Sequence, residues 1–183
     1  ELYLGVPSTG RILHTINHRL FAAQIAYIVD DAQDDVLFVD RTILPTVWAA
    51  VRHQPSVRWI VVMNDSPAIP GDSHAGDSLP ADLRILDYDS LVDAAEPRPG
   101  PFAVDDERTA ASLCYTSGTT GNPKGVLYDH RSVVLHALML LTADGFAIGE
   151  ADVVMPIVPM FHVNAWGLPY AAVMSGATLS LPG

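Results

Sequence analysis

Short apolar runs alternate along this chain with longer segments in which apolar residues recur at helical spacing. The apolar runs predict strands at 36–39, 59–63, 111–115, 125–128, 152–156 and 177–181, the first two covered on both faces. Helical spacing predicts helices in the second half of 11–29 and at 42–51, 87–95, 130–143 and 165–174. This alternation predicts an α/β fold with a mainly parallel sheet and helices on both faces.

Local signals refine several of these elements. Asp129 stands directly before the helix at 130–143, where its carboxylate can cap the first turn. Within that helix, His136 is predicted to be a half-buried packing residue. The last helix is predicted in spite of Pro169. The segment 64–81 is rich in Pro, Gly, Ser and Asp without any period, so it is predicted to be a long exposed loop.

The composition is that of a globular domain. With 183 residues, 49% of them hydrophobic and 17% charged, the chain can bury a core and is predicted to form a single domain or part of one. Its net charge of -11 argues against nucleic acid and anionic membranes as partners. No apolar run reaches the ~20 residues that a membrane span needs, and no signal peptide opens the chain.

Two features bear on location and completeness. Cys114 is the single cysteine, so no internal disulfide can form, and its apolar neighbours predict a buried thiol in a reducing compartment. We therefore expect a cytoplasmic protein. The chain opens at Glu1 without a methionine, followed by a turn-rich stretch (GVPSTG), so we expect both ends to be truncated.

The segment with the most distinctive chemistry is YTSGTTGNPKG, Tyr115 to Gly125. It concentrates hydroxyls, glycines and one cation between two apolar runs: Thr116, Ser117, Thr119 and Thr120; Gly118, Gly121 and Gly125; and Lys124. Glycines let a chain fold around a bound group and present backbone N–H donors, hydroxyls add uncharged donors, and lysine adds a positive charge. The segment therefore predicts a loop that binds a di- or triphosphate.

Two observations define this loop further. It differs from the usual P-loop, because Asn122 and Pro123 separate the glycine from Lys124. It follows the predicted strand at 111–115, which agrees with the rule that ligands bind beyond the carboxyl ends of strands in open α/β sheets. The alternative is a Gly/Thr loop that joins two strands and binds nothing.

The run Tyr115 to Gly125 resembles the phosphate-binding signature of the acyl-adenylate-forming superfamily, which includes acyl-CoA synthetases, adenylation domains of peptide synthetases and luciferases. Further along, VPMFHVNAWGLPYA, Val158 to Ala171, resembles the second core motif in the form seen in medium- and long-chain fatty acyl-CoA synthetases. The text GRILHTINHRL near the start is also similar. The resemblance thus covers nearly the whole chain and implies part of the large N-terminal domain, with the C-terminal domain absent.

The resemblance also implies roles for individual residues. The β- and γ-phosphates of ATP would be bound by Thr116, Ser117, Gly118, Thr119, Thr120, Gly121 and Lys124, and the Thr116 hydroxyl would contact Mg²⁺. Lys124 and His162 would be the catalytic residues. His162, Val163 and Trp166 would contact the acid, with the indole closing a hydrophobic tunnel. The alternatives are a solvated lysine at 124, a core histidine at 162 and a core tryptophan at 166.

By the same resemblance, the full protein would be an AMP-forming fatty-acid–CoA ligase that uses ATP, Mg²⁺ and CoA, and this segment alone would be inactive. Its partners would be small molecules, and a homo-oligomer is compatible with the sequence. Two other readings stay open. One is an adenylate-forming enzyme for an aryl or amino acid, and the other is a phosphate-binding module without catalysis.

Overall fold

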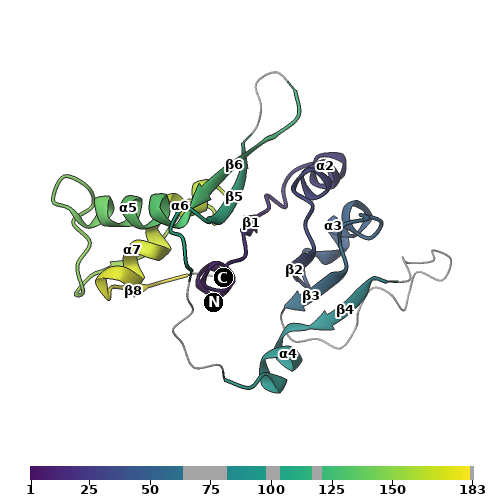
Figure 1. Cartoon of the computed structure of the whole chain (residues 1–183), viewed down its shortest axis with the longest axis horizontal. Helices are drawn as coiled ribbons and strands as arrows, with labels where there is room; N and C mark the ends of the chain where they lie inside the picture. Colours follow the sequence, from purple (N-terminus) through teal and green to yellow (C-terminus); the bar gives the residue numbers. More distant parts are fainter. Residues whose placement is uncertain (64–81, 98–103, 117–120, 182–183) are drawn as a thin grey trace. The chain divides into compact units, whose positions relative to one another are not determined.

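The computed structural model describes residues 1–63, 82–97, 104–116 and 121–181. The loop predicted at 64–81 lies outside these ranges, as do Ser117, Gly118, Thr119 and Thr120. The chain divides into two compact units, one made of Glu1–Asn17, Gly100–Ser117 and Lys124–Gly183, the other of His18–Pro99 and Gly118–Pro123. Each unit is described by itself below (Figure 1).

The second unit is a small α/β unit with three parallel strands. Along the chain it contains α2 (Ala22–Ala32), β2 (Val36–Asp40), α3 (Leu44–Val51), β3 (Trp59–Met63), β4 (Arg84–Asp87) and α4 (Tyr88–Ala94). The strands lie side by side in the order β2-β3-β4. The core is apolar and comes mainly from α2, α3 and β3, including Ile25, Ile28, Val29, Leu44, Trp48, Ile60, Val61 and Val62.

The two strands predicted to be covered on both faces differ. Three successive residues of β3, from Ile60 to Val62, are buried, which confirms that prediction. In β2 the burial alternates, with Val36 and Phe38 exposed at 42% and 36%, so the prediction is wrong there. The face that carries Val36 and Phe38 is only partly covered: the Phe38 ring packs edge-on against the Tyr88 ring of α4, with ring centroids 6.2 Å apart.

The first unit carries the remaining elements. They are α1 (Leu2–Ser8), β1 (Leu13–Thr15), β5 (Ala110–Thr116), β6 (Lys124–Asp129), α5 (His130–Leu141), β7 (Val153–Val154), α6 (Val163–Trp166), α7 (Leu168–Ser175) and β8 (Thr178–Leu179). β5 lies between β1, to which it is parallel, and β6, with which it forms an antiparallel hairpin (Figure 1). β7 and β8 form a separate parallel pair. An apolar cluster of Ala137, Leu140, Ile148 and Ala171 packs α5 against α7.

These findings confirm the α/β class and the mainly parallel pairing, since β5 and β6 form the single antiparallel pair among the described strands. The sequence pattern missed α1, β1 and β4, which are too short to show a period. The helix predicted at 165–174 begins later, at Leu168, for a reason given below. Cys114 is buried, as predicted.

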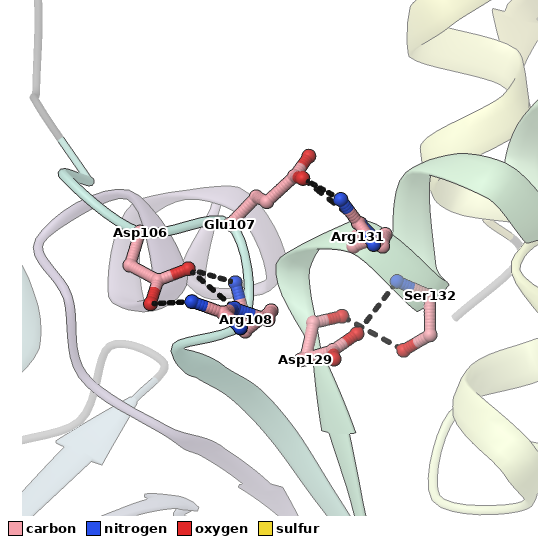
Figure 2. A network of polar contacts seen from close by, with 6 residues as sticks. All are labelled: Asp106, Glu107, Arg108, Asp129, Arg131 and Ser132. Atoms are coloured by element: carbon pink, nitrogen blue, oxygen red, sulfur yellow. Dashed lines mark hydrogen bonds and ion pairs between the residues drawn. The ribbon is translucent and has the colours of Figure 1, made fainter.

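A polar network holds the base of the β5–β6 hairpin, at the end opposite Thr116 (Figure 2). The Arg131 guanidinium binds the Glu107 carboxylate, and Arg108 binds Asp106. The side chains of these pairs are at least half exposed, so each pair contributes little by itself. Asp129 caps α5, because its Oδ1 accepts the Ser132 backbone N–H at 2.7 Å, which confirms the predicted cap.

This cap predicts a pH-dependent effect of Asp129→Ala. The hydrogen bond from the Ser132 backbone N–H lowers the pKa of Asp129 from its ordinary value of 3.8. A carboxyl whose pKa is lowered by folding stabilises the fold above its unfolded pKa, and this contribution is lost as pH falls through the folded pKa. We therefore expect Asp129→Ala to lower the thermal midpoint at neutral pH and to lose this effect in acid.

The matched control for this prediction is Asp129→Asn, which keeps an oxygen acceptor without the charge. Thermal unfolding monitored by circular dichroism between neutral pH and pH 3 measures both variants. We expect Asp129→Asn to lie close to the parent at neutral pH and to keep its cap in acid, where the parent loses the contribution of the charge. A destabilisation by Asp129→Ala that is equally large at pH 3 would contradict a role of the charged cap.

Candidate functional site

The two ends of the predicted phosphate loop are held together by the hairpin. Thr116 closes β5, Lys124 opens β6, and the two residues face each other in the antiparallel register. The Thr116 hydroxyl donates a long hydrogen bond to the Lys124 carbonyl oxygen at 3.4 Å. Thr116, Gly121 and Lys124 are exposed. Both chemistry-bearing ends of the loop are therefore accessible to a ligand, and the alternative of a solvated lysine stays open.

Gly125 allows the hairpin to close tightly next to Lys124. A Cβ placed on Gly125 would lie 3.1 Å from Leu113 Cδ1 and 3.3 Å from the Tyr115 ring. The Tyr115 ring also packs at 5.1 Å from the His14 ring of the neighbouring strand β1. This glycine thus serves packing at the hairpin.

The second motif contains an unusual backbone. Val163, Asn164, Ala165 and Trp166 all have positive φ, between 48° and 57°, and Gly167 follows at 71°. The left-handed conformation costs about 1–2 kcal/mol for each residue other than glycine, and β-branched residues rarely adopt it. Backbone bonds from Ala165 N to the His162 carbonyl and from Gly167 N to the Asn164 carbonyl, both 3.0 Å, close this left-handed turn.

The turn explains why the predicted helix begins late. A right-handed helix cannot include residues 163–167, so α7 starts at Leu168, with Pro169 in the first turn, where a missing N–H is harmless. Such strain persists only where the surroundings hold it, and it is concentrated at functional sites. The left-handed turn, defined as Val163–Gly167, is therefore a candidate functional element.

A buried asparagine anchors the turn to β5. Asn164 is 6% exposed, and its amide nitrogen donates to Ser112 Oγ at 2.5 Å. Its amide oxygen accepts from Cys114 Sγ at 3.1 Å and from Thr15 Oγ1 at 3.4 Å. Removing a buried partner of this kind leaves the other groups unsatisfied, at a cost of about 1–3 kcal/mol. The Asn164 amide therefore ties the second motif to β5, the strand that leads into the first motif.

Two further contacts hold the motif from other helices. His136 of α5 lies with Nε2 3.0 Å from the Trp166 carbonyl oxygen, and a Cβ on Gly167 would lie 2.6 Å from His136 Cδ2. His136 is exposed, so the prediction of a half-buried packing residue is wrong. On the other side of the motif, the Tyr3 hydroxyl of α1 donates to the Met160 carbonyl oxygen.

Two buried phenols, those of Tyr3 and Tyr170, lie near the motif. Burial raises the pKa of Tyr170 to about 12, and burial also raises the pKa of Tyr3, whose ring lies 5.8 Å from that of Tyr170. Both phenols therefore stay protonated at neutral pH and act as neutral packing or donor groups. Neither phenol therefore adds a charge next to the motif.

The three residues predicted to contact the acid lie on the exposed side of the turn. His162 is exposed, and Val163 and Trp166 are 40% and 50% exposed, whereas Asn164 and Ala165 are buried. Neither His162 nor Trp166 is buried among the described residues, and their roles stay predictions. Because Asn164 binds Cys114, two residues before Thr116, and a strand rises about 3.3 Å per residue, the turn meets β5 about 7 Å from its Thr116 end.

The described residues offer few ligands for a metal ion. Among the described residues, no group of three or more His, Cys, Asp or Glu side chains lies together as a metal site would require. The Thr116 hydroxyl is an exposed oxygen of the type that Mg²⁺ accepts. It fits the role of one ligand among several that a bound triphosphate would supply. The sequence patterns indicated no role for Asn164 or Tyr3 and a different one for His136, because their partners are far away in the sequence.

Comparison with known proteins identifies the class. The family model of AMP-binding enzymes matches residues 1–183, so the chain belongs to the AMP-binding enzyme family. Among curated relatives, it is 50% identical to 3-methylmercaptopropionyl-CoA ligase of Ruegeria pomeroyi, over 100% of this chain and 32% of the relative. It is 45% identical to a long-chain-fatty-acid–CoA ligase of Thermus thermophilus, over 100% of this chain and 30% of the relative.

Other comparisons agree with this class. A medium-chain-fatty-acid–CoA ligase of Ectopseudomonas oleovorans is 43% identical, over 100% of this chain and 32% of the relative. The crystal structure of a protein described as a putative long-chain-fatty-acid CoA ligase from Rhodopseudomonas palustris matches with a TM-score of 0.76 at 20% identity, covering 98% of this chain and 40% of that one. This likeness concerns the fold. It confirms that the chain has the fold of N-terminal domains of adenylate-forming enzymes.

The chain spans about a third of the length of the curated relatives it matches. Within the described residues, no helix is both long and apolar enough to cross a membrane.

The left-handed turn predicts different effects for two matched glycine substitutions. Gly167 and Gly176 flank α7 at φ 71° and 77°, so alanine is strained at both, by about 1–2 kcal/mol. At Gly167 the new Cβ also meets the His136 ring at 2.6 Å, whereas at Gly176 the nearest atom is Glu150 Cγ at 3.4 Å. We expect Gly167→Ala to reduce the free energy of unfolding more than Gly176→Ala does.

Urea unfolding of the two variants measures this difference. Gly5→Ala is the control, because Gly5 lies within α1 with nothing within 4 Å, and alanine there is expected to stabilise by about 0.5–1 kcal/mol. Equal losses for Gly167→Ala and Gly176→Ala would show that His136 does not press on the turn.

Proposed function

We propose that this chain is part of an AMP-forming acyl-CoA ligase that activates an aliphatic, fatty-type carboxylic acid with ATP and then transfers the acyl group to CoA. The observation that carries the proposal is the Asn164 amide, which joins the motif of His162 and Trp166 to β5, the strand that ends in Thr116. A triphosphate at the hairpin and an acid at the turn would then be neighbours. The similarity to curated CoA ligases supports the same reaction class.

The reaction requires activation, because the oxygen of a carboxylate is a poor leaving group. A carboxylate oxygen attacks the α-phosphorus of ATP, the bond between the α-phosphorus and the bridging oxygen breaks, and pyrophosphate leaves. The protein then has to hold two anions close together and to balance the charge that builds on the pyrophosphate. The thiol of CoA later attacks the acyl carbon, and AMP leaves.

The residues of this chain divide these tasks. Lys124, with backbone and hydroxyl donors of Thr116, Ser117, Gly118, Thr119, Thr120 and Gly121, binds the β- and γ-phosphates. His162 orients the carboxylate beside the α-phosphate as a polar contact. Val163 and Trp166 line the acyl pocket, for which the large, rigid indole is suited. Lys124 and His162 are thus the catalytic residues that this segment contributes.

Further features of the proposal concern cofactor and location. The Thr116 hydroxyl would hold Mg²⁺ together with phosphate oxygens, and the ion would supply charge neutralisation at the phosphates. We also propose a cytoplasmic enzyme with small molecules as partners, which agrees with the net charge of -11 and the single cysteine. A homo-oligomer is compatible with this proposal.

A panel of acids tests the proposed function. The full-length protein is assayed for AMP and acyl-CoA formation with linear acids from short to long chains, 3-methylmercaptopropionate, benzoate and an amino acid. We expect AMP release that depends on an aliphatic acid, and 3-methylmercaptopropionate belongs in the panel because its CoA ligase is 50% identical to this chain. Activity restricted to benzoate or to the amino acid would favour another adenylate-forming enzyme. ATP binding without AMP release from any acid would favour a module without catalysis.

The phosphate-binding role predicts which half-reaction fails in two variants. Lys124→Ala and Thr116→Ala in the full-length protein should slow adenylation, because charge on the departing pyrophosphate is no longer balanced, by about 100-fold or more for the lysine. Thioester formation from supplied acyl-adenylate should be nearly unchanged. The two half-reactions are measured separately by pyrophosphate release and by acyl-CoA formation. Equal losses in both would remove the assignment.

A further inference from the structure

The left-handed turn Val163–Gly167 has two sides with different surroundings. His162, Val163 and Trp166 are exposed, while Asn164 and Ala165 face the interior at 6% and 0% exposure. An unfavourable backbone of four successive non-glycine residues needs external contacts to persist. The contacts that hold the inner side therefore decide where the outer side chains lie.

The first contact is the Asn164 amide. It meets three side chains that are themselves on paired strands, since Thr15 of β1 lies opposite Cys114 of β5 in the parallel register. Ser112 and Cys114 are 0% and 3% exposed, so the bonds from Asn164 are shielded from water. The amide uses its nitrogen for Ser112 and its oxygen for Cys114 and Thr15, which no other residue type of similar size can do.

The second contact comes from α5. A carbonyl oxygen can only accept, so His136 donates its Nε2–H to the Trp166 carbonyl at 3.0 Å. The same ring lies against Gly167, where no side chain fits. His136 is next to Ala137, which is part of the apolar cluster between α5 and α7, so the donor is carried by a packed helix. The two contacts bracket the turn: Asn164 holds its interior to the sheet, and His136 holds its last residues to α5.

We propose that Asn164 and His136 are positioning residues that set which acids the enzyme accepts, by fixing the left-handed turn and with it the side chains of Val163 and Trp166. This inference rests on the proposed function, because it assigns Val163 and Trp166 to the acyl pocket. The hydrogen bond from His136 is accepted by the backbone carbonyl oxygen of Trp166. Any shift of that backbone moves the largest side chain of the pocket, while Thr116 and Lys124 on the hairpin keep their pairing.

The experiment uses the full-length protein and two pairs of variants. His136→Leu removes the N–H that donates to the Trp166 carbonyl, and His136→Gln keeps an N–H donor. Asn164→Ala removes the buried amide, and Asn164→Asp keeps its shape and an oxygen that can accept from Cys114. Gly176→Ala controls for loss of stability alone, because it strains the other end of α7. For each protein, kcat/KM is measured over the series of linear acids, together with KM for ATP.

We expect His136→Leu and Asn164→Ala to change the ratio of kcat/KM between long and short acids by about tenfold, within the range that one or two methylenes of pocket contact give. KM for ATP should stay within about threefold, and His136→Gln should restore much of the parent profile. The double variant His136→Leu with Trp166→Ala should change the ratio no more than Trp166→Ala alone, since both act through the indole. Gly176→Ala should leave the ratio unchanged.

Other results overturn the inference. A uniform loss for every acid, a parallel rise in KM for ATP, or additive effects of His136→Leu and Trp166→Ala would each show that these residues support the fold and do not position the indole. If the parent protein forms no AMP with any acid, the proposed function fails, and the positioning is still tested by acrylamide quenching of Trp166 fluorescence, with Trp166→Phe as the subtraction control. Unchanged quenching in both His136→Leu and Asn164→Ala would then refute the positioning role.

Discussion

A single buried amide connects the two motifs of this chain. Asn164 comes from the second motif, and its three partners lie on β1 and β5, the latter ending at the phosphate-binding hairpin. Without this connection, the hairpin and the turn would be two separate surface features. With it, the turn that follows His162 lies against the strand that leads to Thr116. The connection ties the turn that carries Trp166 to the strand that ends in Thr116.

The support for the motif is spread over elements that carry no recognisable motif of their own. Tyr3 of α1 binds the backbone before His162, and His136 of α5 binds the backbone at Trp166. The ion pair of Glu107 and Arg131 lies at the other end of the hairpin (Figure 2). Recognition residues are thus exposed at the ends of elements, and their positions are set by neighbours that never touch the ligand in the proposed scheme.

Sequence patterns predicted regular elements well where a local signal, such as an apolar run or a capping residue, decides the structure. β3 has the predicted bounds, and the predicted cap of α5 by Asp129 is confirmed, because each follows from a local signal. The family resemblance predicted that Thr116 and Lys124 bind phosphates, and both residues are exposed at the ends of the paired strands. The roles of the individual site residues stay predictions, and Ser117 to Thr120 lie outside the described residues.

The left-handed turn could not be predicted in this way. Val, Asn, Ala and Trp at 163–166 are ordinary residues for a right-handed helix, and their conformation depends on partners far away in the sequence, at Thr15, Ser112 and His136. Helix α1 was not predicted for a different reason: its sequence, which contains Gly-Val-Pro, is too short to show a helical period. Tertiary hydrogen bonds override local preference at these positions.

The left-handed turn also limits which sequence changes the site can accept. Its inner and outer side chains follow one another within five residues, and its interior is matched to fixed partners on two strands. An insertion or deletion inside it would exchange inward and outward positions and detach the amide. Replacement of an outward side chain leaves that pairing intact. New acid preferences can therefore arise in this architecture by point substitution at constant length, because the partners of Asn164 set the number of residues in the turn.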